Sequence, residues 1–220
     1  SMNHLAPTVG NAQLYSPAAA PAIFDGDSSK TAITSTYSPA TLSQPLTDGF
    51  ARRLTYLRLS ITDFCNFRCE YCLPDGYQGK PPQNELSISE IDTLIRGFAE
   101  VGTKKVRITG GEPSIRRDVV DIIKTIKNTE GIETVAMTSN GYKLGKHLAN
   151  WQAAGLNQLN ISMDSFDAAT FHEMTGFDML PQLLADMDTL LATTDIKLKI
   201  NSILMAETAF ENLMNAIDYV

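Results

Sequence analysis

Apolar and polar residues alternate along five short segments after residue 50. In the segment 54–62, Leu57, Leu59 and Ile61 alternate with polar residues, which is typical of a strand with one buried face. The same alternation predicts four further strands, at 104–109, 134–140, 158–164 and 196–204.

Stretches with helical spacing of apolar residues separate these strands. Ser87 is followed three residues later by Glu90, which is the capping-box signal for the start of a helix. The apolar stripe that begins there ends at Gly102, a residue type that commonly terminates helices. Similar stripes predict further helices near 119–126, 148–154, 180–191 and 207–220.

A strand followed by a helix, repeated five times, predicts parallel strands joined by right-handed crossovers. Two architectures fit this order, an open doubly wound sheet and a barrel. The central strands of a doubly wound sheet are buried on both faces and read as continuous apolar runs. Here one face of nearly every strand is polar, although single polar positions can also mark strand ends. We therefore predict an α/β fold, a partial (β/α) TIM-like barrel of about five βα units, with a site at the C-terminal ends of its strands.

The first fifty residues differ in composition from the rest. Ala, Pro, Ser and Thr account for 26 of them, and no helical or strand periodicity is present. This composition is typical of disordered segments, so we expect a flexible extension over residues 1–49 and one domain over 50–220.

Charge and cysteine content narrow the functional class. The net charge of −7 and the isoelectric point near 4.9 argue against a nucleic acid as the partner, because proteins that bind nucleic acids usually present a basic surface. No apolar run reaches the length of a membrane helix, and no secretory leader is recognisable, so we expect no membrane contact. The few, clustered cysteines do not resemble a disulfide framework, which favours a reducing, cytoplasmic compartment.

All three cysteines, Cys65, Cys69 and Cys72, lie in the loop after the first predicted strand. Three buried thiols acting as small apolar side chains are one interpretation. Structural zinc is a second, but it needs a fourth ligand, and the three histidines are distant in sequence. The interpretation that the spacing favours is a [4Fe–4S] cluster with one iron left open for a substrate or cofactor.

This arrangement resembles the radical S-adenosylmethionine (SAM) superfamily. Its signature is Cys-x3-Cys-x2-Cys after the first barrel strand with an aromatic residue before the third cysteine, where this chain has Tyr71. The superfamily's Gly-Gly-Glu-Pro motif matches "ITGGEP" at 108–113, where a close backbone approach needs glycine. The resemblance implies that the three cysteines hold a [4Fe–4S] cluster that binds SAM. It also implies SAM contacts from four residues: Tyr71, Gly111, Glu112 (to the SAM ammonium) and Ser162.

Four stretches are closely similar to the GTP 3′,8-cyclase family of molybdenum cofactor biosynthesis: "LRLSITDFCNFRCEYCLP", "KKVRITGGEPSIRRD", "MTSNGY" and "LNISMDS". The similarity covers about residues 50–220. It implies reductive cleavage of SAM to a 5′-deoxyadenosyl radical, which takes the 3′ hydrogen of GTP so that C3′ can attack C8 of guanine. It further implies an electron donor of the flavodoxin or ferredoxin type and an association of two chains. The residues that it implies in GTP binding are Arg58, Lys105, Arg107, Thr138 and Lys199.

The pattern of charges agrees with a triphosphate substrate. Arg58, Arg107 and Lys199 occupy the polar faces of three different strands, and inward cations are costly without an anionic partner. An internal ion pair with Asp63 or Asp164 is the alternative for these cations. For Lys105 and Lys197 the alternative is a solvated strand end. Ser162 and Thr138 could instead fill the barrel. Residues 115–118, "IRRD", are expected to be a solvated helix start.

The chain departs from the cyclase family in two respects. The family has a second three-cysteine cluster in its C-terminal part and a tail that ends in Gly-Gly, and this sequence contains neither. Phe64 also replaces the arginine that commonly precedes the first cysteine. We therefore expect the front two thirds of such an enzyme, unable to complete GTP cyclisation by itself. The alternatives are another radical SAM enzyme, such as a peptide-modifying or activating one, and a non-catalytic fragment that binds an iron–sulfur cluster or SAM.

Overall fold

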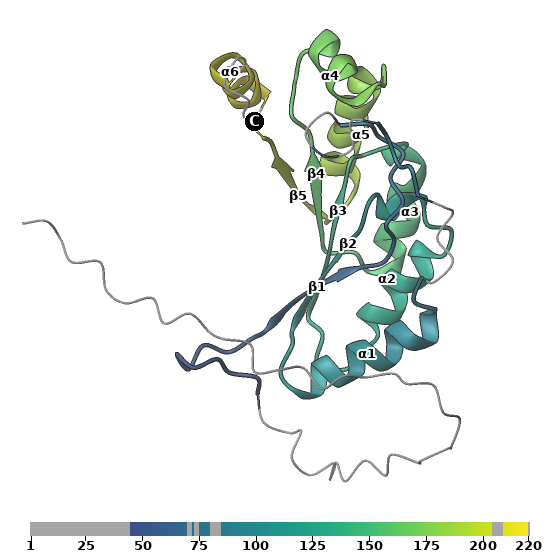
Figure 1. Ribbon diagram of the computed structural model, residues 1–220, viewed down its shortest axis with the longest axis vertical. Helices are drawn as coiled ribbons and strands as arrows, with labels where there is room; N and C mark the ends of the chain where they lie inside the picture. The colour runs from purple at the N-terminus through teal and green to yellow at the C-terminus, as the bar shows by residue number, and fades with distance from the viewer. Residues whose placement is uncertain (1–44, 70–71, 73–74, 80–84, 204–208, 220) are drawn as a thin grey trace, which may run out of the picture. The chain divides into compact units, whose positions relative to one another are not determined.

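The computed structural model describes residues 45–69, 72, 75–79, 85–203 and 209–219. Five parallel strands form one sheet in the order in which they occur along the chain (Figure 1). They are β1 (Tyr56–Ser60), β2 (Lys105–Thr109), β3 (Thr134–Ser139), β4 (Gln158–Ser162) and β5 (Lys197–Asn201).

Helices alternate with these strands: α1 (Ile88–Glu100), α2 (Val119–Lys127), α3 (Leu144–Ala154), α4 (Ala168–Thr175), α5 (Leu180–Thr193) and α6 (Ala209–Tyr219). A single 3₁₀ turn, η2 (Pro113–Ile115), precedes α2. Neighbouring helices pack in sequence, α1 on α2, α2 on α3 and α3 on α5, and together they cover one face of the sheet (Figure 1). A doubly wound sheet would reverse its strand order and carry helices on both faces. The predicted partial barrel is therefore confirmed.

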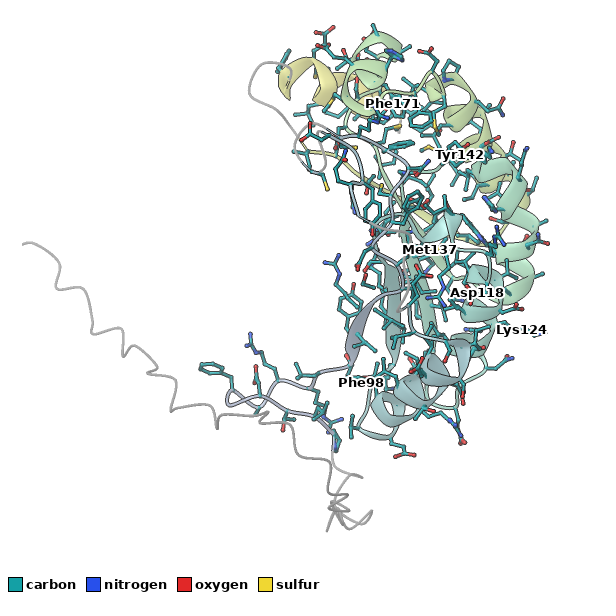
Figure 2. The ribbon with its side chains drawn as sticks, turned by 45° about the vertical axis from the view of Figure 1, so that its right-hand side comes forward. Phe98, Asp118, Lys124, Met137, Tyr142 and Phe171 are labelled. Carbon is teal, nitrogen blue, oxygen red and sulfur yellow. The ribbon has the colours of Figure 1, made fainter. Side chains whose placement is uncertain are left out.

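The alternation in the sequence determines which face the helices cover. Val106 and Ile108 of β2 are fully buried beneath the helices, as is Met137 in the middle of the sheet, whereas Lys124 is exposed on α2 (Figure 2). The opposite face, hereafter the polar face, carries the residues that alternate with this core. Its side chains come from Arg58, Lys105, Arg107, Thr138, Gln158, Asn160, Lys197 and Lys199.

Local signals explain where the helices begin and end. The predicted capping box is present at α1, because the Ser87 Oγ accepts a hydrogen bond from the Glu90 N–H at 3.2 Å and Glu90 accepts one from the Ser87 N–H at 2.8 Å. Gly155 takes a φ of 96° after α3, in the left-handed region that favours glycine.

One helix was not predicted. Asp167 caps the short α4 by accepting a hydrogen bond from the Thr170 N–H at 2.9 Å, and Gly176 ends it with a φ of 79°. Both signals are in the sequence, but the apolar stripe of α4 is too short to recognise. The predicted last helix corresponds to α6, and its positions 207, 208 and 220 lie outside the described residues.

A backbone hydrogen bond holds the described segment before β1 to the domain. The Leu46 N–H donates to the Val101 carbonyl at 2.9 Å, just after α1. Residues 1–44 lie outside the described part, so the flexible extension over 1–49 stays a prediction. In the segments that the structure does describe, no helix is both long enough and apolar enough to cross a membrane.

Candidate active site

The cysteine loop and the Gly-Gly-Glu-Pro turn are joined by backbone hydrogen bonds beyond the ends of β1 and β2. The Gly111 N–H donates to the Thr62 carbonyl at 2.7 Å, and the Glu112 N–H donates to the Phe64 carbonyl at 2.8 Å. The two loops therefore leave the C-terminal edge of the sheet as a pair, with Cys65 directly after the second contact.

The glycines allow this close approach. A Cβ on Gly111 would overlap the carbonyl group of Phe64, and one on Gly110 would overlap the Thr62 carbonyl oxygen. A backbone oxygen cannot swing away as a side chain can, so the motif needs glycine at both positions. The backbone that approaches these glycines closely is that of the cysteine loop and the residues just before it.

The three thiols occupy graded environments. Cys65 and Cys69 are half-buried against the core, and Cys72 is exposed, with its N–H donating to the Cys69 carbonyl at 2.9 Å. Burial is the main reason that the pKa of the Cys65 thiol is raised; the charges of Glu112 and Cys72 also raise this pKa, and backbone N–H groups of Phe67 and Asn66 lower it. In the described part of the chain, no three Cys, His, Asp or Glu side chains converge closely enough to hold a metal ion.

Glu112 ties the loop after β2 to the loop after β3. Its side chain is 1% exposed, and Oε1 accepts hydrogen bonds from the Ser114 N–H at 3.0 Å and the Ser139 hydroxyl at 2.7 Å. Oε2 accepts one from the Asn140 N–H at 2.6 Å. Burial raises the pKa of this carboxyl, although the hydrogen bonds oppose the shift. Both oxygens of Glu112 have protein partners, and its predicted contact with the SAM ammonium stays a prediction.

An amide pair extends this network to the cysteines. The Asn140 Nδ2 donates to Asn66 Oδ1 at 3.0 Å, and Asn66 directly follows Cys65. A chain of hydrogen bonds thus runs from Glu112 through Asn140 to the cysteine loop, so the three loops that follow β1, β2 and β3 are mutually fixed.

Arg116 ties the segment after η2 to the residue that follows β1 and to the residue that precedes the cap of α1. Its guanidinium donates to the Ile61 and Leu86 carbonyls, both at 2.6 Å, and to Asp118 at 2.7 Å. Only 6% of its side chain is exposed. The expectation of a solvated helix start at 115–118 is therefore wrong for Arg116, because carbonyl groups at the end of β1 and before α1 require a buried donor. Arg117 beside it is exposed, as expected.

The polar face gathers the cations that the sequence nominated for GTP. Arg58 and Arg107 are directly opposite each other in register on β1 and β2. The Arg107 guanidinium donates to the Tyr56 hydroxyl at 2.8 Å and to the Thr138 hydroxyl at 3.3 Å. Lys105 reaches across β3 and donates to Gln158 Oε1 on β4 at 2.7 Å.

These cations repel one another. The pKa of Lys105 is lowered, first by burial and then by the charges of Arg107, Lys199 and Lys197. Five basic side chains lie on the polar face: Arg58, Lys105, Arg107, Lys197 and Lys199. None of them forms an ion pair with a carboxylate among the residues that the structure describes, which argues against the alternative of internal ion pairs. A set of unneutralised cations on one sheet face suits a polyanionic ligand.

The structure therefore brings Arg58, Lys105, Arg107, Thr138 and Lys199 onto one face. Ser162 is the last residue of β4, Gly111 is exposed in its turn, and Tyr71 lies outside the described residues. Three further members of the polar face, Gln158, Asn160 and Lys197, were not nominated as site residues from the sequence. Their signal was the strict alternation of β4 and β5, which assigns each of them to the same side as Ser162 or Lys199.

Comparison with known proteins agrees with this site. The model of the "Radical SAM superfamily" matches residues 59–218. A GTP 3′,8-cyclase of Pectobacterium atrosepticum is 51% identical over 177 residues, which are 80% of this chain and 54% of that protein. The chain thus spans about half the length of this curated relative.

Solved structures share the fold. Streptococcus suis SuiB bound to S-adenosylmethionine superimposes with a TM-score of 0.62 at 17% identity, over 80% of this chain and 38% of that one. The [FeFe]-hydrogenase maturase HydG superimposes with a TM-score of 0.54 at 18% identity, over 66% of this chain and 34% of that one. At such identities the likeness concerns the fold alone.

A partial βα barrel with three thiols in the loop after its first strand, joined to a Gly-Gly-Glu-Pro turn, defines a class of SAM-dependent iron–sulfur enzymes. The chain belongs to the radical SAM superfamily. Members of this superfamily use a [4Fe–4S] cluster and SAM, so the cofactor prediction is confirmed at that level.

The residues present suit these cofactors. One loop offers three thiols, those of Cys65, Cys69 and Cys72. Ligation requires that the thiols lose their protons. Burial disfavours this loss at Cys65, and binding to a metal cluster favours it. A bound cluster would supply the electron for reductive cleavage of SAM to a carbon radical. The protein holds the cysteine loop in place through Glu112 and Asn140.

Proposed function

We propose that this chain is the SAM-cleaving and triphosphate-binding part of a GTP 3′,8-cyclase of molybdenum cofactor biosynthesis. The observation that carries the proposal is the group of five basic side chains on the polar face, without carboxylate partners among the described residues, on the sheet that also presents the three cysteines. The similarity to the Pectobacterium cyclase supports the same substrate.

In this proposal, Arg58, Lys105, Arg107 and Lys199 bind the triphosphate, and Thr138 orients Arg107. Tyr71, Gly111, Glu112 and Ser162 contact SAM near the cysteines. The 5′-deoxyadenosyl radical takes a hydrogen atom from C3′ of GTP to give 5′-deoxyadenosine. The C3′ radical then bonds to C8 of guanine as the C8–N7 π bond breaks, and the resulting N7-centred radical takes one electron from the proposed reductant and one proton from solvent.

Nucleotide titration of Arg107→Ala tests the proposal. Loss of charge-assisted hydrogen bonds should weaken binding of GTP, and of inorganic triphosphate, by about 10- to 100-fold. Arg96→Ala is the matched control, because Arg96 pairs with Asp92 on the exposed side of α1 and should leave both affinities unchanged. Wild-type protein that binds neither ligand would contradict a nucleotide substrate and favour a peptide substrate.

SAM cleavage separates an enzyme from an inert cluster-binding fragment. After anaerobic reconstitution, dithionite should release 5′-deoxyadenosine from SAM, and Cys65→Ala should abolish this release. Iron and sulfide incorporation without any 5′-deoxyadenosine would instead support the non-catalytic interpretation.

Further properties belong to the same proposal. We infer a cytoplasmic protein, a reductant of the flavodoxin or ferredoxin type, and a pair of chains in solution. The radical SAM domain spans 50–220 behind a flexible extension over 1–49. Sedimentation of the reconstituted chain tests the association, and limited proteolysis before residue 50 tests the domain boundary.

A further inference from the structure

Asn160 lies in the middle of the polar face, on β4. It is opposite Thr138 of β3 and Lys199 of β5 in register. Its neighbours Leu159 and Ile161 are fully buried under the helices, so the alternation of the strand directs the Asn160 side chain to the other face. Gln158, two residues earlier on that face, receives the hydrogen bond from Lys105.

The position of the Asn160 side chain lowers the stability of the fold. The residue is only 6% exposed, and its Oδ1 is fully buried and has no hydrogen-bond partner. Among the described residues, three other side chains carry such an atom, but they belong to a loop, to η2 and to α3, and Asn160 alone is on a strand. A buried amide oxygen without a donor destabilises the fold, so an apolar residue would suit the empty protein better.

The order of side chains along β4 indicates what the amide meets. Gln158 is in register with Lys197 and accepts from Lys105, Asn160 is in register with Lys199, which is the last of the triphosphate cations toward the C-terminal edge, and Ser162 ends the strand at that edge. Alternate residues of a strand are about 6.6 Å apart, so Asn160 lies one such step from each. In a nucleotide, the unit directly attached to the phosphates is the sugar.

We propose that Asn160 binds a hydroxyl group of the nucleotide's sugar and so presents the sugar to the SAM-derived radical. This proposal rests on the proposed function. A hydroxyl both donates and accepts, which matches the Oδ1 acceptor and the Nδ2 donor of one amide. The sugar hydroxyl of the substrate then donates the hydrogen bond that Oδ1 lacks. A deoxynucleotide without that hydroxyl leaves Oδ1 buried with no donor.

The test compares ligands that differ by one hydroxyl. GTP, 2′-deoxy-GTP, 3′-deoxy-GTP and inorganic triphosphate are titrated into the reconstituted wild type, Asn160→Ala and Asn160→Leu. The wild type should bind GTP about 10-fold more tightly than at least one deoxy analogue, as one hydrogen bond allows. Both variants should lose this preference, with the affinity for inorganic triphosphate unchanged.

Thermal unfolding without ligand distinguishes substrate binding from a structural role. Asn160→Leu replaces the unsatisfied amide by an apolar group of similar size, so its Tm should equal or exceed that of the wild type. A lower Tm with the sugar preference intact would overturn the proposal. Wild-type protein that binds neither GTP nor triphosphate would instead refute the proposed function, whereas triphosphate binding without any sugar preference would refute only the role of Asn160.

Discussion

Replacement of Glu112 by glutamine tests the network that holds the cysteine loop. The side chain keeps its shape but exchanges one acceptor oxygen for an NH₂ donor. The three groups that now donate to Glu112 are the Ser114 N–H, the Ser139 hydroxyl and the Asn140 N–H. The hydroxyl can rotate to accept, but the two backbone N–H groups cannot.

The magnitude follows from these contacts. The two backbone N–H groups donate to different oxygens of Glu112, so either orientation of the new amide leaves one buried N–H without an acceptor. Such a loss costs about 1–3 kcal/mol. For a chain of this length, 1 kcal/mol corresponds to a Tm change of about 2–4 °C, so a central value of about 2 kcal/mol predicts a decrease of about 4–8 °C.

Urea denaturation and thermal unfolding of the chain measure this change at pH 7.5. Glu173→Gln provides the control, because Glu173 is exposed on α4 and should change stability by less than about 0.5 kcal/mol. Glu112→Gln that is as stable as the wild type would show that the carboxylate does not hold the β2 and β3 loops together, and the account of the loop network would fail.

Three further predictions follow from the same loops. Burial raises the pKa of the Glu112 carboxyl above its ordinary value of 4.5, so the folded wild type binds the carboxyl proton more tightly than the unfolded chain does. The wild type therefore loses stability as pH rises from 4.5 to the folded pKa. The stability difference between the wild type and Glu112→Gln, measured by urea titration at several pH values, should shrink over that rise. Gly111→Ala should reduce the iron bound per chain after anaerobic reconstitution, because the new Cβ overlaps the Phe64 carbonyl next to Cys65; iron content equal to the wild type would contradict this. Arg116→Ala should destabilise the chain by about 3–5 kcal/mol in urea, since buried carbonyls and Asp118 lose their donor, whereas exposed Arg117→Ala should have almost no effect.

Much of the fold could be predicted from the sequence because local patterns and tertiary packing agree. The alternation in β2 buries Val106 and Ile108, and the capping box at Ser87 forms as expected. The sheet order was not in the pattern itself, but a polar face on nearly every strand required helices on one side only. The helix α4 was missed because a helix of that length depends on its caps more than on its stripe.

The sequence predicts those site residues whose type is required by the chemistry. It does not predict those whose role depends on contacts between distant parts of the chain. The cysteine spacing and the glycines carry their own signal. Arg116 does not, because its role depends on carbonyl groups at positions 61 and 86 that only the folded chain brings together. For the same reason, the sequence did not predict that Glu112 accepts hydrogen bonds from Ser139 at the end of β3 and from Asn140 directly after it.

The central claim is that a nucleoside triphosphate binds to the polar face within reach of the SAM-derived radical. Isotope transfer tests it most directly. The reconstituted chain is incubated anaerobically with SAM, dithionite and GTP that carries deuterium at C3′, and the 5′-deoxyadenosine is analysed by mass spectrometry. The account predicts 5′-deoxyadenosine that contains one deuterium, and loss of this transfer in Arg107→Ala. Release of 5′-deoxyadenosine without deuterium, although GTP is bound, would contradict it.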